Sequence, residues 1–388
     1  VIDWEFRHQR PQQLALQFAE RGHRVYYFRT TFSSTEAYEP VVRLVAPNVF
    51  TVSLPCTGKP PVIYSESLDP AQLDSVVSGI EQLRTRFSIG AAVSVVDHPF
   101  WAPVCGRLTN HRVVYDCMDH HAGFSNNNSN VLSQESRLLG SADLVVASSA
   151  KLFEMVKASS AHPLLVRNAG QYDHFCTAPA KLAFEKTRPV IGYYGAISEW
   201  FDAELVAQAA RQMPECDFVL VGSTYGANLL PVKDLPNVRL FGEVPYTDLP
   251  GYLHGFDVCM IPFQVNELTL ATNPVKVYEY LSAGKPVVSI DLPELALMKD
   301  VIETAATTEA FVAGLRKALT DNAPARVEAR RAFARENTWA KRGEVLDAAL
   351  NALFPKVSVI VLTFNQLEFT QRCLASLERF TQYPNWEL

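Results

Sequence analysis

Short apolar runs of four to six residues alternate with helical patterns along the chain, and this alternation limits the possible folds more than any other feature. Each run of the second half is followed by a turn and then by apolar residues at helical spacing, as for Phe311, Leu315 and Leu319. The pattern is typical of parallel sheets whose strands are connected by helices. The predicted strands are Arg24–Phe28, Val49–Leu54, Ala92–Asp97, Arg112–Tyr115, Leu144–Ala147, Leu164–Val166, Val190–Tyr194, Phe218–Val221, Val238–Phe241, Val258–Ile261 and Val287–Ile290.

A polar, mixed stretch interrupts the alternation at Thr177–Arg188, and we predict a linker there. Open α/β sheets bind ligands beyond the carboxyl ends of their strands, so we expect a cleft between the two halves. The predicted fold is therefore α/β, with two Rossmann-like doubly wound domains facing a cleft and a C-terminal strand–helix fragment of a further α/β domain. The predicted units are residues 1–176 (first strand truncated, because Val1–Asp3 reads as the end of a strand), the linker 177–188, residues 189–334, a helix over 335–354 and the fragment 355–388.

The composition excludes several classes of protein. Hydrophobic residues make up 48% of the 388 residues and charged residues 20%, which is globular and excludes disorder. The net charge of −6, without long runs of either sign, argues against a nucleic-acid partner. No apolar stretch approaches the ~20 residues of a membrane helix. Seven scattered cysteines, never in CxxC spacing, fit a reducing compartment. We expect a cytoplasmic protein with at most peripheral contact at the inner face of the membrane.

The segment 273–286 carries the most specific single pattern. It predicts a helix with Asn273 as N-cap, Pro274 at the first helical position, and a glycine and a proline at its end. Lys276 in the first turn opposes the helix dipole, whereas an anion at that N-terminus would be favoured by the dipole, the free N–H groups and the ammonium. Glu279, one turn on, is placed to accept hydrogen bonds from a ribose attached to that phosphate. An exposed i,i+3 ion pair on an ordinary helix is the open alternative.

Glycine-containing turns follow three of the predicted strands in the second half. Gly195–Ser198 follows Val190–Tyr194, and Gly222 and Gly242 occupy the same position after the next two strands. Glycine lets the backbone approach a ligand closely, and the Ser198 hydroxyl is able to donate to a phosphate. A glycine needed for sheet packing alone is the alternative. Three such turns at one sheet edge favour one ligand site.

Four segments of the second half carry a family likeness, namely Ile191–Asp202, Pro236–Pro245, Asp257–Pro262 and Asn273–Pro286. They resemble the donor-binding half of GT-B glycosyltransferases, most closely the nucleotide-sugar-dependent group that includes family 4. Asp3–Gln12 and Val114–Asp119 are similar to acceptor-side segments of bacterial members that act in cell-surface polysaccharide assembly. The likeness covers about residues 1–354, including Asn337–Trp339 and the final helix, which in this fold usually crosses back to the first lobe.

The resemblance implies a hexosyltransferase-type module that moves a sugar from a nucleotide-diphosphate sugar to a saccharide or lipid-linked acceptor, in bacterial cell-surface polysaccharide synthesis. The second lobe would bind the donor and the first lobe the acceptor. GT-B enzymes generally need no metal, so no cofactor is expected for this module, and family 4 likeness implies retention of configuration. The implied donor-binding residues are Gly195, Ser198, Gly222, Val244, Asn273, Pro274, Lys276 and Glu279, with Glu279 matching the glutamate that binds the donor ribose.

The chain departs from the family pattern at three places. Ala271 stands where a second glutamate is common. Ser198 and two acidic residues follow the first glycine turn, where many relatives carry Arg and Lys to hold the diphosphate. Met118 stands where relatives often carry a histidine close to the reacting sugar. We therefore expect Lys276 to supply the positive charge that the glycine turn lacks.

Catalytic and acceptor-side candidates lie in the first half. His98 and Asp119 are the catalytic candidates, because each follows a predicted strand at the end that faces the expected cleft. A satisfied loop histidine and a helix N-cap are their alternatives. No metal site is expected, because the second half has no matching ligand cluster. The acceptor-side candidates, for which solvated surface charge or simple packing is the alternative, are Trp4, Arg7, Arg10 and His120.

The C-terminal residues carry a resemblance of their own. Val357–Asn365 and the helix after it are similar to the start of family 2, GT-A glycosyltransferases, which implies two transferase modules in tandem. The metal-binding acidic motif of that family would lie beyond Leu388, so a divalent metal would concern only that truncated domain. Val357–Leu362 predicts a strand, and Leu367–Phe380 predicts a helix that buries Cys373, Leu374 and Leu377.

Two other functions share parts of this pattern. A sugar-nucleotide epimerase has the same two-lobed fold and would convert the donor sugar without any acceptor. A non-enzymatic two-lobed sugar-binding protein is the second alternative. The scattered cysteines and the nucleotide-type helix at Asn273–Pro286 argue against the binding protein.

Overall fold

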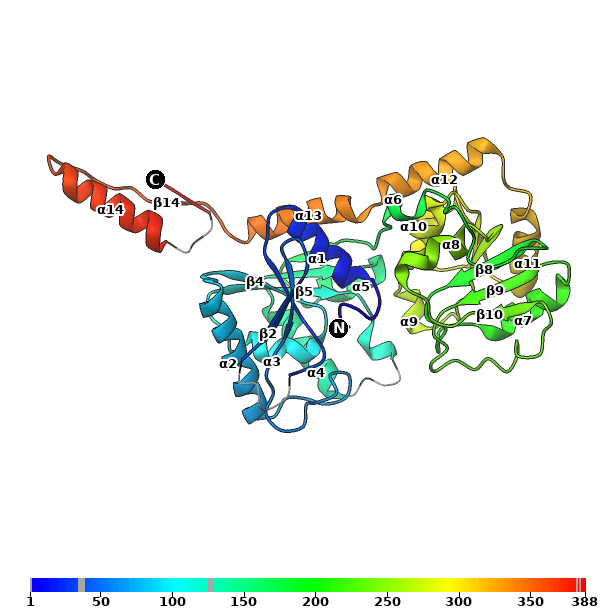
Figure 1. Ribbon diagram of the computed structural model, residues 1–388, viewed down its shortest axis with the longest axis horizontal. Helices are drawn as coiled ribbons and strands as arrows, with labels where there is room; N and C mark the ends of the chain where they lie inside the picture. The colour runs from blue at the N-terminus through cyan, green and yellow to red at the C-terminus, as the bar shows by residue number, and fades with distance from the viewer. Residues whose placement is uncertain (1, 34–38, 125–126, 128, 382, 384) are drawn as a thin grey trace.

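The computed structural model describes residues 2–33, 39–124, 127, 129–381, 383 and 385–388. Two α/β lobes lie side by side, and a pair of helices runs along one edge of both (Figure 1). A small C-terminal unit extends away from the first lobe (Figure 1).

The first lobe contains two separate groups of strands. A three-stranded sheet has the order β1-β3-β2 and a four-stranded sheet has the order β4-β5-β6-β7, and every pair is parallel except β2 with β3. The strands are β1 (Val25–Phe28), β2 (Val41–Ala46), β3 (Val49–Ser53), β4 (Ala92–Val96), β5 (His111–Cys117), β6 (Leu144–Ala147) and β7 (Pro163–Leu165). The helices are α1 (Arg10–Glu20), α2 (Pro70–Arg86), α3 (Ala102–Cys105), α4 (Ser129–Ser141) and α5 (Ala150–Lys157), with short 3₁₀ turns η1 (Pro99–Trp101) and η2 (His121–Gly123).

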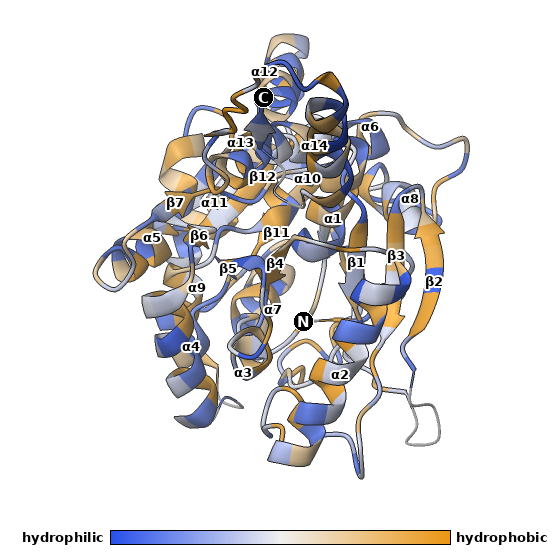
Figure 2. Cartoon of the chain, turned by 90° about the vertical axis from the view of Figure 1, so that its left-hand side faces the viewer, coloured by the Kyte–Doolittle hydropathy of each residue, from blue (hydrophilic) through white to orange (hydrophobic). Residues whose placement is uncertain are grey.

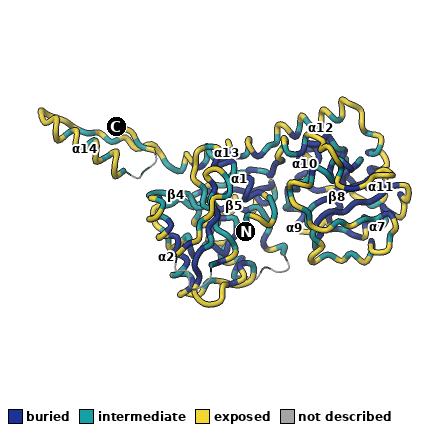
Figure 3. Tube along the Cα trace, in the orientation of Figure 1, coloured by how far each residue is buried: buried dark blue, intermediate teal, exposed yellow. Residues whose placement is uncertain are grey.

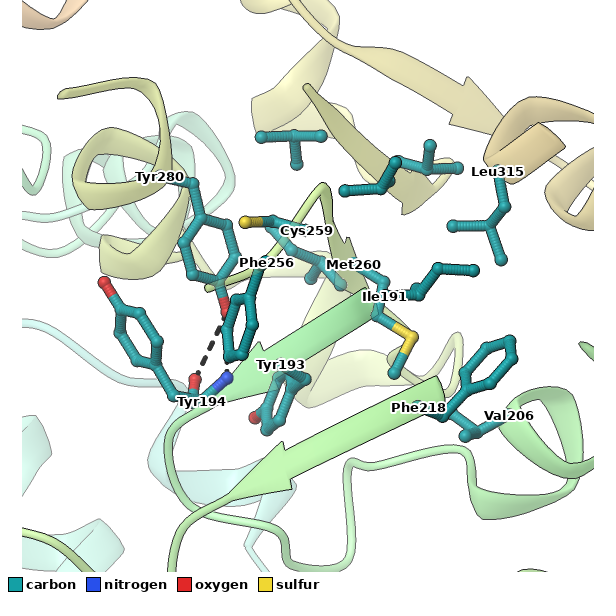
Figure 4. Packing of buried hydrophobic residues seen from close by; sticks show 14 of the residues in the cluster. Ile191, Tyr193, Tyr194, Val206, Phe218, Phe256, Cys259, Met260, Tyr280 and Leu315 are labelled. Carbon is teal, nitrogen blue, oxygen red and sulfur yellow. Dashed lines mark hydrogen bonds between the residues drawn. The ribbon is translucent and has the colours of Figure 1, made fainter. Parts of the chain in front are cut away.

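The second lobe is built on one continuous parallel sheet of six strands, in the order β10-β9-β8-β11-β12-β13. Its core gathers aromatic and aliphatic side chains from β8, β9 and the flanking helices, including Tyr193, Phe218, Phe256 and Tyr280 (Figure 4). The strands are β8 (Val190–Tyr194), β9 (Asp217–Val221), β10 (Val238–Leu240), β11 (Val258–Ile261), β12 (Val287–Ile290) and β13 (Glu303–Ala305). The helices are α6 (Tyr172–Phe175), α7 (Ala203–Gln212), α8 (Leu249–Leu253), α9 (Glu267–Leu270), α10 (Val275–Ser282) and α11 (Thr308–Ala318), with turns η3 (Tyr246–Asp248) and η4 (Pro293–Met298).

Helices α12 (Pro324–Glu336) and α13 (Trp339–Ala352) connect the lobes. The chain leaves the second lobe through α12, and α13 packs on α1 of the first lobe. Trp339, Leu346 and Leu350 join Leu14 and Phe18 in one buried cluster. Helix α13 therefore contributes to the core of the first lobe.

The described residues of the C-terminal unit (355–381, 383 and 385–388) include no buried side chain. The two-residue strands β14 (Val357–Ser358) and β15 (Trp386–Glu387) pair with each other. None of the residues of α14 (Leu367–Phe380) is buried (Figure 3). The prediction of a strand over Val357–Leu362 is therefore too long. The prediction that α14 buries an apolar face is wrong, because the structure gives this helix no sheet to pack on; Cys373 is exposed, and Leu374 and Leu377 are half-buried.

Most strands predicted for the two lobes are confirmed within one or two residues. Val190–Tyr194, Val258–Ile261 and Val287–Ile290 form strands with those bounds. Asp69 also caps α2, where its Oδ1 accepts a hydrogen bond from Gln72 N at 2.9 Å. Strands β2 and β13 were not predicted, because neither shows a continuous apolar run.

Candidate functional site

Asn273 is not the N-cap of α10. Pro274 occupies that position with extended backbone, and the helix begins at Val275. The Asn273 side chain is buried and reaches across to the first lobe, where its Oδ1 accepts from Asn168 N at 3.0 Å. Its Nδ2 donates to Glu294 Oε2 at 3.0 Å. The predicted capping role is wrong because these partners hold the amide at the junction between the lobes.

Glu279 lies in the second turn of α10 and is 6% exposed. Its Oε2 accepts a hydrogen bond of 2.8 Å from the Tyr194 hydroxyl, at the end of β8. Burial raises the pKa of Glu279 to about 7, against the opposing effects of the Tyr194 hydrogen bond and the Lys276 charge. The carboxylate is therefore held in one orientation, and its other oxygen, Oε1, makes no hydrogen bond among the described residues.

Lys276 is a cation without a carboxylate partner among the described residues. Its Nζ lies 5.2 Å from the centre of the Tyr193 ring and 5.0 Å from that of Phe263. Burial lowers the pKa of Lys276 to about 8; Glu279 raises this pKa and Arg7 lowers it further. The faces of the two rings attract the ammonium, but burial still removes water from it, and an anion beside it would offset that loss of hydration.

The glycine turn after β8 lies directly against Lys276. Gly195 has a φ of +126°, and a Cβ there would come within 2.8 Å of Lys276 Cε. Gly222 after β9 has a φ of +148°, and a Cβ there would stand 1.9 Å from Gly195 O. Gly222 N donates to Gly242 O at 2.6 Å. The three predicted turns therefore lie together, as expected.

Not every N–H group of the first turn is available to a ligand. Gly195 N donates to Val221 O at 2.9 Å and Ile197 N to Ser223 O at 2.8 Å. Ser198 is half-buried, and a Cβ at Gly226 would lie 3.1 Å from its hydroxyl oxygen. Val244 is also half-buried and packs against the core of the second lobe. The positive charge at this place comes from Lys276 rather than from the turn.

Arg7 reaches the same place from the first lobe. Its Nε and Nη2 donate to the two carboxylate oxygens of Glu243 at 2.9 and 2.8 Å, and Glu243 also accepts from Ser223 N at 3.0 Å. The charge of Arg7 lowers the pKa of both Lys276 and Tyr64, so it lies within electrostatic reach of both lobes. The predicted acceptor-side residue Arg7 thus lies at the junction, beside the glycine turns. Its partner Glu243 was missed, since a carboxylate 236 residues away leaves no local pattern.

Arg10 is not at the mouth of a cleft. It is 3% exposed and donates from Nε and Nη2 to Asp116 at 2.7 and 2.8 Å, and from Nη1 to Val166 O and Asn168 Oδ1. The expectation that it meets an acceptor is wrong, because all these bonds lie inside the first lobe. Arg10 holds the ends of β5 and β7 together.

Two acidic side chains lie beside this buried pair at the ends of β4 and β5. Burial and the charge of Asp116 raise the pKa of Asp97 to about 7 and that of Asp119 to about 6. Asp119 is a predicted catalytic residue, and it is half-buried without capping a helix. Asp97 was missed, although the end of the run Ala92–Asp97 was a usable signal. Titration near neutral pH in a strand-end position is typical of functional carboxyl groups.

The predicted histidines, His98 and His120, have surroundings that suit a catalytic role less well than those of Asp119. His98 is 2% exposed, its Nδ1 accepts from Phe100 N at 3.2 Å, and burial lowers its pKa to about 3. This is the arrangement of a satisfied loop histidine. His120 is half-buried, and burial and the charge of Lys151 lower its pKa. Trp4 packs edge-on against Tyr27, with ring centres 5.3 Å apart, so the structure gives it a packing contact.

The junction between the lobes is closed by a buried network that the sequence did not indicate. Glu294 is 2% exposed; its Oε1 accepts from Ala150 N at 2.6 Å and its Oε2 from Arg167 Nε at 2.8 Å. Ser149 Oγ donates to Ala271 O at 2.6 Å. Ala271, where a second glutamate is common in the resembled family, is therefore a buried contact between the lobes.

Within the residues that the structure describes, no group of three His, Cys, Asp or Glu side chains is arranged to hold a metal ion. In the same residues, no helix is both long and apolar enough to cross a membrane.

Comparison with known proteins identifies the second lobe. Residues 188–321 match the family model Glycosyl transferases group 1. The second lobe is a glycosyltransferase group 1 domain. Residues of the glycosyltransferase domain that carry the arrangement above include Gly195, Gly222, Lys276 and Glu279.

Relatives extend the likeness beyond the glycosyltransferase domain. A Bacillus subtilis (strain 168) protein, TuaH, whose name assigns it to teichuronic acid biosynthesis as a glycosyltransferase, is 29% identical over 254 residues, which are 59% of this chain and 64% of TuaH. The chain thus spans under two thirds of that relative's length.

Solved structures share the fold. Sucrose-phosphate synthase from Thermosynechococcus elongatus has a TM-score of 0.67 at 16% identity, over 89% of this chain and 92% of that chain. HepE of Anabaena, solved with UDP and glucose, has a TM-score of 0.61 at 15% identity, over 89% of this chain and 98% of that chain. The chain therefore has the GT-B type of α/β fold with parallel sheets.

Proposed function

We propose that the chain is a glycosyltransferase that transfers a sugar from a nucleotide-diphosphate sugar to a saccharide or lipid-linked acceptor, in the synthesis of a bacterial cell-surface polysaccharide. The observation that carries this proposal is the ammonium of Lys276, which has no carboxylate partner among the described residues and lies against the Gly195 turn. Glu279 lies one turn further along the same helix. The name of TuaH, a teichuronic acid glycosyltransferase, supports the polysaccharide role.

The donor would lie across the amino end of α10. Lys276 and the free N–H groups of the first helical turn would hold the diphosphate, because cation, dipole and N–H groups all favour an anion there. Glu279 would accept hydrogen bonds from the ribose through the oxygen that Tyr194 leaves free. Charge developing on the departing diphosphate would be stabilised by groups that are already in place. Such preorganised groups are effective because they need not rearrange during the reaction.

The acceptor would enter from the first lobe. Asp97 and Asp119, with pKa values of about 7 and about 6, are able to accept the hydrogen bond of an acceptor hydroxyl near neutral pH. Arg7 would bring a second positive charge toward the diphosphate or an anionic acceptor. We further propose that transfer retains configuration, and that residues 355–388 belong to a GT-A domain.

A thermal-shift screen against UDP, GDP, dTDP and their common sugar conjugates tests the donor assignment. Ligand at about 100 times its dissociation constant stabilises a fold by about 2.7 kcal/mol, so binding is readily detected. We expect one nucleotide to raise the unfolding temperature, Glu279→Ala to abolish the shift, and Glu154→Ala, an exposed acid on α5, to preserve it. A chain that no nucleotide stabilises, or an undiminished shift in Glu279→Ala, would contradict the proposal.

A further inference from the structure

Residues before and within α1 of the first lobe contact the loop that follows β10 in the second lobe. Arg7 donates to both carboxylate oxygens of Glu243, at 2.9 and 2.8 Å. The rings of His8 and Tyr246 lie with their centres 4.9 Å apart, and Gln13 Nε2 donates to the Tyr246 hydroxyl at 3.3 Å. An ion pair, a ring contact and a hydrogen bond therefore join the lobes at one place. We call these residues the latch.

The second-lobe side of the latch has partners that do not belong to the first-lobe residues of the latch. Glu243 Oε2 also accepts a hydrogen bond from Ser223 N at 3.0 Å, in the turn after β9. The ring of His174 in α6 stacks on Tyr246, with centres 4.6 Å apart, and His174 Nε2 donates to Tyr246 O at 3.1 Å. These contacts would remain if Arg7 and His8 moved away. The surface on which the first lobe docks is therefore already formed.

The latch differs in exposure from the buried network at the lobe junction. The side chains of Arg7 and Glu243 are 23% and 39% exposed, so water already reaches their ion pair. Asn273 and Glu294 of the buried network are 1% and 2% exposed. Water competes with an exposed ion pair and makes it weak, whereas the buried network would have to take up water before it parted. The lobes should therefore separate more readily at the latch than at the buried network.

The latch lies beside the proposed donor site at Lys276 and Glu279. Burial lowers the pKa of Lys276 to about 8, and the charge of Arg7 lowers it further. Burial and the charge of Glu279 raise the pKa of Tyr246. Both latch residues are therefore within electrostatic reach of the donor site. Figure 1 shows the lobes side by side, and Figure 2, which looks along the same axis from the first-lobe end, shows the first lobe in front of the second.

We propose that the latch holds the two lobes closed beside the donor site and has to part before a nucleotide enters or leaves. Glu243 and Tyr246 are then positioning residues, because they set the place of the first lobe rather than bind the ligand. Such closing contacts slow the exchange of a ligand and often determine the turnover of an enzyme. The identity of the ligand rests on the proposed function, whereas the closure of the lobes does not.

Charge reversal in the full 388-residue chain tests the latch. Arg7→Glu and Glu243→Arg each place like charges together, whereas the double variant restores an attractive pair. Arg107→Glu is the matched control, because it reverses an arginine whose partner, Asp74, lies in the same lobe. Small-angle X-ray scattering of the nucleotide-free chain measures the radius of gyration. We expect each single latch variant to increase this radius, and the double variant and the control to keep the original value.

Release of a bound nucleotide gives a second readout. Stopped-flow displacement of UDP, GDP and dTDP measures the dissociation rate of each nucleotide that binds. Arg7→Glu and Glu243→Arg should each speed release at least about tenfold, and the double variant should restore the original rate. His8→Ala, which removes the ring contact and leaves Arg7 and Glu243 in place, should speed release about threefold.

Three results would overturn the latch. The first is a radius of gyration that neither single variant changes. The second is a double variant that stays as open as the single variants. The third is faster release without any change in scattering, which would assign to Arg7 a direct effect on the charge of the ligand. If none of the three nucleotides binds, the proposed function fails, and the scattering alone decides whether the latch holds the lobes closed.

Discussion

The strand β8 in the middle of the second lobe is fully buried, whereas β1 and β4, the edge strands of the two sheets of the first lobe, are not. All five residues of β8 are buried, but β4 buries only Val96 and β1 only Tyr27. In the second lobe the strands β11 and β9 flank β8 on its two sides. The support of the two halves of the proposed site therefore differs. Lys276 and Glu279 stand on a complete core, while Asp97 and Asp119 follow strands of a divided sheet.

The first lobe contains a buried ion pair between Arg10 and Asp116. Removing this pair has the largest expected effect on the free energy of unfolding. Arg10→Ala would leave Asp116 as an uncompensated buried charge, at a cost of about 3–5 kcal/mol in the free energy of unfolding. Arg7→Ala is the matched control three residues earlier: its pair with Glu243 is partly exposed, and its loss should cost at most about 1 kcal/mol. Urea unfolding measures both. Equal costs would mean that the first lobe does not depend on the Arg10–Asp116 pair.

The turns at Gly195 and Gly222 in the second lobe leave no room for a side chain. Gly222→Ala would place a Cβ against Gly195 O in a backbone conformation that alanine adopts only under strain, at a cost of about 2–4 kcal/mol. Gly140→Ala in α4 of the first lobe meets nothing within 4 Å. It should stabilise the chain by up to about 1 kcal/mol. Thermal unfolding of the two variants compares the lobes; a harmless Gly222→Ala would show that the turn is looser than described.

A smaller effect on stability is expected at Lys276, whose proposed role is in ligand binding. Because the pKa of Lys276 is about 8 against its ordinary 10.5, the unfolded chain binds more protons between these pH values, and stability rises with pH across that window. Lys276→Met should therefore stabilise the nucleotide-free chain at pH 7 by about 1–2 kcal/mol and flatten this rise. Lys157→Met, at an exposed lysine of α5, should change neither. Urea unfolding at pH 7 and pH 10 measures both effects, and a destabilised Lys276→Met would contradict the assignment.

The sequence predicted those strands whose formation depends on their own residues. The run Val190–Tyr194 forms a strand because it is apolar throughout and buried on both faces. Strand β2 was missed because it is antiparallel to β3 at a sheet edge, with Val41 and Leu44 exposed. Such a strand has no continuous apolar signal.

Residues whose partners are distant in the sequence were the least predictable part of the site. The capping prediction for Asn273 failed because Asn168 and Glu294 compete for its amide. The local sequence does not distinguish Arg10 from Arg7, but Arg10 is buried in the first lobe, where it pairs with Asp116. Lys276, Glu279 and the glycine turns were predictable because they lie on one helix and on adjacent strand ends.

Calorimetric titration with UDP, GDP and dTDP at pH 7 and pH 9, for the original chain and Lys276→Met, tests the central claim most directly. Since the pKa of Lys276 is about 8, the original chain should bind one nucleotide at pH 7 and bind it about tenfold more weakly at pH 9. Lys276→Met should bind weakly at both pH values, without that decrease. Equal affinity of the two proteins, or an affinity of the original chain that does not change with pH, would contradict a diphosphate site at Lys276.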